Sequence, residues 1–522
     1  MNTNKLLIKE LIKNKAVTAG DLALAKRKLA KKYKTSCPSN ISLLRTYHEL
    51  IRNRSIKKSE ILEQMLKTRP IRSLSGIVNI SVLTKPYPCP GKCIYCPLEK
   101  GIPKSYLSGE PAVERAKRLN YDPYLQVKKR VEMLEIEGHP TDKVELRIIG
   151  GTWSYYPKTY QEWFIKKCFQ AANGTIKEKT LEQEQKTNEK AKNRIIGLSI
   201  ETRPDFINEK EIKHLRQLGV TMVELGVQST INSVLKLNQR GHGREEVIKA
   251  TRLLKDAGFK ILFQMMPNLP GSDLKKDEEM FKDLFLGPLF QPDLLKIYPC
   301  ALLKEAPLYK KRKELNYRPY SKQQLIQLIK KIKKGIPEYV RIQRIIRDIP
   351  SEKIMAGPAK ISNLRQVLSE LSEKEGWQCN CIRCREIKEK YNPKEKLYLV
   401  KTEYRASEGK EIFLSFENIN KKIYSLLRLR VPSEQVFIPV LKNSAVIREL
   451  HTYGPVHPIK KSNINNSAQH KGLGKELIKE AEKIAKKEFG FEKIAVISGV
   501  GARDYYRKLG YQLIDNYMVK NL

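Results

Sequence analysis

Three cysteines in the segment CPGKCIYC, Cys89, Cys93 and Cys96, have a spacing that can hold three irons of a four-iron, four-sulfur cluster. The fourth iron would stay open. It could bind the amino and carboxyl groups of S-adenosylmethionine (SAM) and reduce its sulfonium, which releases a 5′-deoxyadenosyl radical. Tyr95 would shield such a cluster. A structural zinc knuckle is the alternative, but no fourth ligand lies nearby in the sequence. The spacing therefore predicts radical chemistry.

Glycines and polar residues follow three later apolar runs. Gly150 and Gly151 end one run, where bare backbone would let the methionine part of SAM approach. Glu201 and Arg203 follow the next run, and Gln228 follows the one after. Each could be an ordinary cap or rim salt bridge, but barrel active sites lie at the C-terminal ends of strands. We expect these residues to bind SAM.

A second cysteine group, Cys379, Cys381 and Cys384, places three thiolates within six residues. That density predicts a tetrahedral structural zinc site that lacks one ligand. Cys300, which ends another apolar run, is the preferred fourth ligand, with a histidine or Cys168 as competitors. Unligated surface cysteines are the alternative.

A glycine-rich turn, QHKGLG, opens an amphipathic helix expected over 473–489. A helix N-terminus presents free N–H groups to an anion, here the pyrophosphate of coenzyme A. The residues expected to bind it are Gln469, Gly472, Leu473, Gly474 and Lys475.

Alternating strands and helices are expected to position the first site. Six apolar runs predict buried parallel strands, joined by helices into a partial (β/α)6 barrel. Their ranges are 77–83, 144–149, 195–200, 222–227, 260–266 and 294–298. A polar stretch, 173–193, is predicted to be an exposed helix or a mobile loop.

The pattern divides the chain into four parts. We expect a basic helical region (1–70), the partial barrel (71–345), a linker with the cysteine cluster (346–396) and an α+β domain (397–522). The last part shows strand-like runs at 397–404, 411–417, 423–430, 445–453 and 493–498, with a short helix near Tyr505.

The charge of the chain favours a polyanionic partner. Its 522 residues include 100 Lys and Arg against 57 Asp and Glu, a net charge of +43, and 17 against 5 fall within residues 1–70. Such a field attracts nucleic acid, although a uniformly lysine-rich proteome would look similar. No apolar run is long enough for a membrane span, and none resembles a signal peptide. We expect a cytoplasmic protein, with its cysteines reduced or bound to metal.

Joined to this barrel, the C-terminal segment resembles the Gcn5-related N-acetyltransferase (GNAT) pattern, and a radical SAM barrel with a GNAT domain resembles the catalytic subunit of the Elongator complex in its stand-alone archaeal or bacterial form. The matching segments are 89–96, 118–124, 142–145, 150–152, 200–205, 224–229, 296–299 and 494–511.

The resemblance implies a reaction. Members of the family convert the wobble uridine of certain tRNAs to 5-carboxymethyluridine, with SAM as radical source and acetyl-CoA as the two-carbon donor. The radical would take hydrogen from the acetyl methyl group, the carbon radical would add to C5 of uracil, and water would release coenzyme A. An external electron donor and the tRNA anticodon stem-loop are the implied partners. Whether the chain acts as a monomer or a homodimer is left open.

The same resemblance assigns residues of the acetyl-CoA site. The strand at Leu450, His451, Thr452 and Tyr453 would lend backbone to the pantetheine arm. Tyr505 or Tyr506 would lie near the thioester sulfur, unless both are core aromatics. Lys143 matches a position implicated in contacting acetyl-CoA from the barrel side, although from the sequence alone it is a surface lysine.

Two departures leave alternatives open. The four-cysteine zinc set is not universal in the family, and no obvious general base for amine acetylation is visible, Glu449 being the nearest candidate. A protein lysine acetyltransferase with a structural barrel, or a tRNA-binding scaffold with a degenerate barrel, would be the competing functions.

Overall fold

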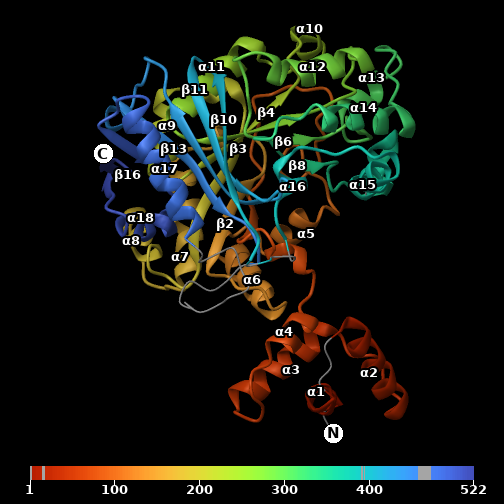
Figure 1. Ribbon diagram of the computed structural model, residues 1–522. Coiled ribbons are helices and arrows are strands. Elements are labelled where there is room, and N and C mark those ends of the chain that lie inside the picture. The colour runs from red at the N-terminus through yellow and green to blue at the C-terminus, as the bar shows by residue number, and fades with distance from the viewer. Residues whose placement is uncertain (1–2, 15–17, 362, 389–391, 393, 456–471) are drawn as a thin grey trace.

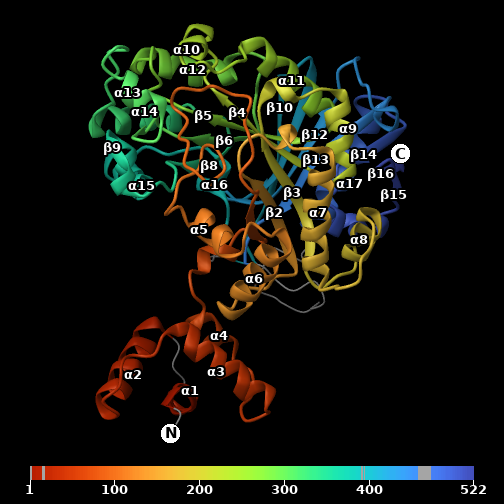
Figure 2. The ribbon, with the colours of Figure 1, turned by 180° about the vertical axis from the view of Figure 1, so that it is seen from behind.

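The computed structural model describes residues 3–14, 18–361, 363–388, 392, 394–455 and 472–522. Figures 1 and 2 show a main body of two joined sheets, with a small helical bundle at the N-terminus standing away from it. Among the described residues, no helix combines the length and the apolar character needed to cross a bilayer.

The N-terminal bundle has a small core of its own. Its second, third and fourth helices begin at side-chain caps, with Thr18, Ser39 and Ser59 each accepting a hydrogen bond from a backbone N–H of the first turn. Leucines and Tyr47 pack inside it, and lysines and arginines occupy the outside. Its helices are α1 (Thr3–Lys13), α2 (Ala19–Lys32), α3 (Asn40–Arg52) and α4 (Glu60–Leu66).

Seven parallel strands form the first sheet, in the order β1-β2-β3-β4-β5-β6-β8. They are β1 (Val78–Leu83), β2 (Lys143–Ile149), β3 (Arg194–Thr202), β4 (Met222–Gln228), β5 (Lys260–Met265), β6 (Leu294–Ile297) and β8 (Arg341–Ile345). The six predicted strands and the partial barrel are confirmed. The seventh was missed because Arg341–Ile345 carries two arginines and a glutamine, and so does not read as an apolar run.

Helices between the strands cover the outside of this sheet (Figure 2). They are α5 (Pro111–Arg118), α6 (Pro123–Ile136), α7 (Lys158–Asn173), α9 (Glu209–Gln217), α10 (Asn232–Leu237), α11 (Arg244–Asp256), α12 (Leu274–Leu286), α13 (Pro307–Lys311) and α14 (Lys322–Lys334). The apolar strands and helix faces share one core, which holds the strand ends in fixed relative positions.

The polar stretch 173–193 is ordered and only partly exposed. It forms α8 (Leu181–Asn188), which buries Leu181 and Asn188 against α7. Glu189 then accepts hydrogen bonds from Arg503 and Arg507 of the C-terminal domain. The prediction of an exposed helix or mobile loop for this stretch is therefore wrong. Its buried polar side chains form hydrogen bonds with two neighbouring parts of the structure, so the stretch can pack although it is polar.

The second sheet has the order β10-β11-β12-β13-β14-β16-β15. Its strands are β10 (Tyr398–Ala406), β11 (Gly409–Glu417), β12 (Ile423–Val431), β13 (Ser444–Thr452), β14 (Lys493–Val496), β15 (Gln512–Ile514) and β16 (Tyr517–Asn521), with helices α17 (Leu473–Lys487) and α18 (Arg503–Arg507). β13 and β14 are parallel but pair only over Ser444–Ile447, and β13 continues beyond that pairing as far as Thr452. In the chain, α15 (Leu364–Glu375) and α16 (Ile382–Arg385) connect the two sheets, and β7 (Leu302–Leu303) pairs antiparallel with β9 (Ile354–Ala356) in a separate two-stranded sheet. The predicted domain boundaries stay predictions.

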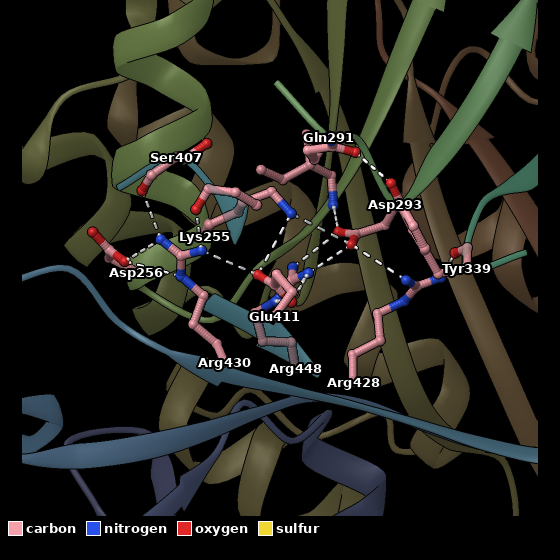
Figure 3. A network of polar contacts seen from close by, with 12 residues as sticks. Lys255, Asp256, Gln291, Asp293, Tyr339, Ser407, Glu411, Arg428, Arg430 and Arg448 are labelled. Atoms are coloured by element: carbon pink, nitrogen blue, oxygen red, sulfur yellow. Dashed lines mark hydrogen bonds and ion pairs between the residues drawn. The ribbon is translucent and has the colours of Figure 1, made fainter. Parts of the chain in front are cut away.

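A buried network of charges joins the two sheets (Figure 3). Arg428 and Arg430 of β12, and Arg448 of β13, point from the second sheet toward two acids of the half-barrel, Asp256 at the end of α11 and Asp293 just before β6. Arg430 donates to Asp256 Oδ1 at 2.7 Å, and Lys255 lies 3.5 Å from Glu411 Oε1 and 3.7 Å from Asp293 Oδ1. Burial lowers the pKa of Lys255 to about 8. Because buried charges are tolerated only when paired, this network fixes the two sheets against each other.

Candidate active site

The cysteine loop follows β1 at the C-terminal edge of the half-barrel. Backbone hydrogen bonds secure it on both sides, since Ile94 N donates to Asn238 O and Ile94 O accepts from Leu308 N. Cys93 is buried, while Cys89 and Cys96 are partly exposed. The three cysteines therefore sit on a loop that is fixed by neighbouring elements rather than by its own hydrogen bonds alone.

Two arginines direct positive charge at this loop. Arg240 Nη1 donates to Cys93 Sγ at 3.5 Å, and this cation lowers the pKa of Cys93 although burial raises it. Arg203 pairs with Asp205 through Nε and Nη2, but its Nη1 is buried with no hydrogen-bond partner. A Cβ on Gly91 would lie 2.5 Å from that Nη1, 3.5 Å from Cys93 Sγ and 3.6 Å from Cys89 Sγ.

This arrangement fits an anionic cluster. An unpaired buried N–H is costly unless a ligand satisfies it, and the one on Arg203 lies beside two of the three sulfurs. Among the described residues, the group of His, Cys, Asp or Glu side chains whose ligand atoms lie close enough to share a single metal ion is Cys379, Cys381 and Cys384, and not this triad. Its wider spacing suits a multi-iron cluster better than one metal ion.

The other predicted strand-end residues lie around the same edge. Gly150 has φ 136°, and a Cβ there would lie 1.9 Å from Thr84 Oγ1, so only glycine fits. Gly151 also has a positive φ, and Gln228, with φ 73°, lines the cavity described next. Glu201 accepts from Tyr106 Oη at 2.8 Å and from Gln264 Nε2 at 3.2 Å.

A cavity of about 590 Å³ opens inside the half-barrel, next to Tyr95 and Cys96. Its wall carries an excess of cations over carboxylates. The cations are Arg72, Arg115, Arg130, Arg147, Arg341, Arg344, Arg347, Arg383, Lys296 and Lys388, and the carboxylates are Glu110, Glu201, Asp348 and Glu386. The volume is that of a small-molecule or nucleotide site. The charge favours an anionic ligand.

The sequence reading missed most of this wall. Lys296 of β6 bonds Glu224 of β4 and lies 3.5 Å from Glu201. These side chains sit inside apolar strands, where a single charged residue is the signal that one face of the strand lines a cavity. Arg240 gave no such signal, because it lies in a loop after α10.

The second cysteine group is brought together as predicted. The sulfurs of Cys379, Cys381 and Cys384 lie within 4.8 Å of one another. Lys333 Nζ donates to Cys384 Sγ at 3.6 Å, and the three thiols act electrostatically on Arg365. Three sulfurs at this distance fit a single metal ion.

Cys300 does not join this group, so the predicted fourth ligand is corrected. Ile382 N donates to Val340 O, which places the three cysteines by the start of β8. Cys300 lies beyond the end of β6, the parallel neighbour of β8, and packs with Tyr317 under the first cysteine loop. Parallel strands put these two positions at opposite ends of the sheet.

In the C-terminal domain, the predicted site residues converge where β13 runs on past its pairing with β14. Gly472 caps α17 with φ 86°. A Cβ on Gly474 would lie 3.2 Å from Tyr505 Oη, 3.6 Å from Leu450 and 3.8 Å from Thr452. Tyr505 is 37% exposed, whereas Tyr506 packs in the domain core. Leu473 is buried and Lys475 exposed, and Gln469 lies outside the described residues.

The end of β13 also touches the first domain. His451 Nε2 bonds Ser75 O at 2.7 Å, and its ring stacks on Tyr453. Ser75 lines the cavity of the half-barrel. The strand predicted to bind acetyl-CoA therefore contacts a residue in the wall of that cavity.

Lys143 and Glu449 lie at the other end of the half-barrel from the cysteine loop. Lys143 begins β2, and burial lowers its pKa to about 8. Glu449 is ion-paired with Lys260 at 3.1 Å and with Arg428 at 2.8 Å. Although burial raises its pKa, these cations lower the pKa of Glu449 to about 2. Such a carboxylate is a weak base for amine acetylation.

The fold and the two sites define a class: a radical SAM half-barrel joined to an acetyltransferase domain. Family models agree, matching the Radical SAM superfamily over 87–284, the Radical_SAM C-terminal domain over 292–373 and the Acetyltransferase (GNAT) family over 445–511.

Relatives narrow the class to one family. The chain is 45% identical to a "tRNA uridine(34) acetyltransferase" of Methanocaldococcus infernus, over 91% of both chains. It is 39% identical to "Elongator complex protein 3" of Bos taurus, over 89% of this chain and 87% of that protein. A solved structure of the M. infernus Elp3, lacking residues 1–46, superposes with a TM-score of 0.76 at 43% identity, covering 86% of this chain and all of that one. The chain belongs to the tRNA uridine(34) acetyltransferase and Elongator complex protein 3 family.

Proposed function

We propose that this enzyme modifies uridine 34, the wobble base of tRNA, forming 5-carboxymethyluridine from acetyl-CoA with a radical derived from SAM. Relatives at 45% identity are named for uridine 34 of tRNA. The observation that carries the proposal within this chain is the contact of the acetyltransferase strand β13 with Ser75, in the wall of the cavity beside the cysteine loop. Radical formation from SAM and binding of acetyl-CoA must occur close together, because both contribute to the same product.

In this proposal, Cys89, Cys93 and Cys96 hold a four-iron cluster, whose open iron supplies reductive cleavage of SAM. Arg240 and Arg203 offset the negative charge of the cluster and its thiolates. Gly150 and Gly151 let SAM approach the backbone closely. Glu201, which Tyr106 and Gln264 hold in place, would form hydrogen bonds with the polar groups of SAM, and so would Gln228.

Acetyl-CoA would be bound by the C-terminal domain. The N-terminus of α17, at Gly472, Leu473 and Gly474, offers backbone N–H groups to the pyrophosphate, with the exposed Lys475 beside them. Gln469, outside the described residues, stays a proposed contact of the same ligand. The end of β13, which is paired with β12 but no longer with β14, would hold the pantetheine arm along its free edge. Tyr505, close to Gly474 and Leu450, is better placed than the core residue Tyr506 to reach the thioester. Lys143 would contact the ligand from the barrel side.

The tRNA would enter at the cationic cavity. Phosphate contacts give most of the affinity of such complexes, and the target base must leave its loop to reach a buried site. The basic bundle α1–α4 connects to the cavity wall through Arg72 and Ser75, so it could hold the anticodon stem-loop at the mouth. Because the proposed substrate is cellular tRNA, we also propose a cytoplasmic location.

A structural zinc ion on Cys379, Cys381 and Cys384 completes the proposal. Lys333 and Arg365 lie beside the three thiolates and would offset their charge. Such an ion would tie the linker to the start of β8.

The test is anaerobic incubation of the reconstituted enzyme with tRNA, SAM, acetyl-CoA and dithionite, followed by mass spectrometry of uridine 34. We expect the carboxymethyl base from the wild type and none from Cys93→Ala. An unmodified base would refute the proposal. Acetylated peptide that survives Cys93→Ala would instead support a lysine acetyltransferase.

A further inference from the structure

A continuous row of aromatic rings runs along the outer side of the cysteine loop. It links Trp163 and Tyr160 of α7 to Tyr156 and Tyr87, and continues through Tyr155 to Phe206. The centroid distances between successive rings are 5.6, 5.1, 4.8, 6.0 and 5.9 Å. We call these six residues the aromatic row.

The row is not ordinary core packing. Trp163 is 39% exposed and Tyr155 is 40% exposed, although both belong to a continuous set of ring contacts. A hollow of about 600 Å³ adjoins it, lined in part by Lys85, Tyr121, Leu125, Tyr160 and Trp163. The row is thus open to solvent at Trp163 and Tyr155, while Tyr156 between them is buried and anchors it. Exposed tyrosine and tryptophan rings beside a hollow favour a site of interaction, because both residue types are common in protein interfaces.

The row lies beside Cys89, which is not among the residues that line the cavity. Tyr87 is two residues before Cys89, and Cys89 Sγ lies 3.8 Å from Thr152 Oγ1, at the start of the turn that carries Tyr155. Tyr156 Oη bonds Thr84 Oγ1 and Lys85 O, both just upstream. Cys96, in contrast, lines the cationic cavity. The cysteine loop therefore has a substrate side and an aromatic side.

Cations border the aromatic side. Lys85 Nζ lies 4.9 Å from the centroid of Tyr160, and Lys92 and Lys158 are exposed nearby in sequence. Lys158 pairs with Glu211, and Asp205 beside Phe206 pairs with Arg203. The other acids of this face are the exposed Glu162 of α7 and Asp122 in the lining of the hollow. With a net charge of +43 on the chain, this face attracts an acidic protein.

We propose that the aromatic row with Lys85 is the docking surface for an acidic, ferredoxin-like one-electron carrier protein that reduces the cluster. This inference rests on the proposed function, which requires one electron for each SAM cleaved. Electron transfer weakens steeply with distance, so the carrier must approach the cluster closely. A tRNA bound at the cavity mouth would block the substrate side, whereas the aromatic side adjoins Cys89, which is only partly buried. Complexes of this kind are small and transient, which suits one row of exposed rings.

The experiment compares two reductants on the full-length reconstituted enzyme. The rate of 5′-deoxyadenosine formation from SAM is measured with dithionite, which needs no docking, and with a reduced low-potential ferredoxin. In the double variant Lys85→Glu and Tyr155→Ala, we expect the ferredoxin-driven rate to fall by about tenfold or more and the dithionite-driven rate to stay unchanged. Raising ionic strength should slow only the ferredoxin reaction.

The matched control lies on the C-terminal domain. Lys396 Nζ sits 5.3 Å from the ring of Tyr398, which is 42% exposed, so the pair repeats the chemistry of Lys85 and the row at the start of β10, in the second sheet. Lys396→Glu with Tyr398→Ala should leave both rates unchanged.

Three outcomes would overturn the inference. An unchanged ferredoxin rate in the Lys85 and Tyr155 variant would remove the docking role. Equal loss with both reductants would show that the row supports the cluster loop instead, and weaker tRNA binding by the variant in a filter assay would assign the surface to RNA. Absence of 5′-deoxyadenosine from the wild type with dithionite would refute the proposed function itself.

Discussion

Asp293 and Arg448 form a paired contact across the two domains, with Arg448 Nη1 and Nη2 donating to Asp293 Oδ2 and Oδ1 at 2.9 and 2.6 Å. Neither side chain reaches solvent. Arg448 also donates to Glu411 of its own sheet and to Phe259 O of the half-barrel. The same strand, β13, carries His451 and the proposed pantetheine contacts. The pair therefore fixes the acetyl-CoA strand relative to the half-barrel.

Replacing Arg448 by Met should destabilise the protein strongly. The change leaves Asp293 and Glu411 as buried carboxylates with too few cations, a defect that costs about 3–5 kcal/mol. We expect a lower midpoint in urea denaturation and earlier loss of the interface between the sheets. Lys129→Ala, which removes an exposed pair with Glu132 on α6, should change stability by about 0.5 kcal/mol or less. Equal effects of the two substitutions would contradict this view of the interface.

Replacing Arg240 by Gln should make the cluster harder to reduce. Its guanidinium contacts Cys93 Sγ and favours the more negative, reduced state of a bound cluster. We expect the reduction potential to become more negative by on the order of tens of millivolts, measured by redox titration with EPR detection. Arg240→Lys keeps the charge and should restore part of the loss. A potential that does not move in either variant would show that Arg240 serves only the loop.

Acetyl-CoA binding should weaken as the pH rises through about 8. Burial lowers the pKa of Lys143 to about 8, so its positive charge is present below that pH and lost above it. If the ammonium contacts the anionic ligand, loss of the charge should raise the dissociation constant by about tenfold. Calorimetric titrations between pH 7 and pH 9 would measure it, and Lys143→Arg should abolish the dependence. An identical pH profile in the wild type and this variant would remove Lys143 from the site.

The sequence predicted the strands and the cysteine motif better than it predicted which side chains line the cavity and the interface between the sheets. Cys89, Cys93 and Cys96 were recognisable because a cluster dictates their spacing within one loop. Strand β8 was not, because its two arginines and a glutamine do not form an apolar run. Lys296 lies in a strand that was predicted, but its place in the cavity wall shows only once the fold supplies its partner Glu224. Arg240 is 147 residues from Cys93, so only the folded chain shows their contact. The charged interface is also hidden in sequence, since arginines on alternate positions of β12 read as a solvent-facing edge.

Zinc content should separate the two cysteine sets. We expect the purified wild type to carry about one zinc per chain by mass spectrometry, and Cys384→Ser to lose it because two thiolates hold zinc poorly. That variant should also unfold more easily, since the ion would tie the linker to the start of β8. Cys300→Ser should keep its zinc, because Cys300 lies beyond the opposite end of the sheet beside Tyr317. Loss of zinc from Cys300→Ser would reinstate it as the fourth ligand, and iron bound at Cys89, Cys93 and Cys96 should be the same in both variants.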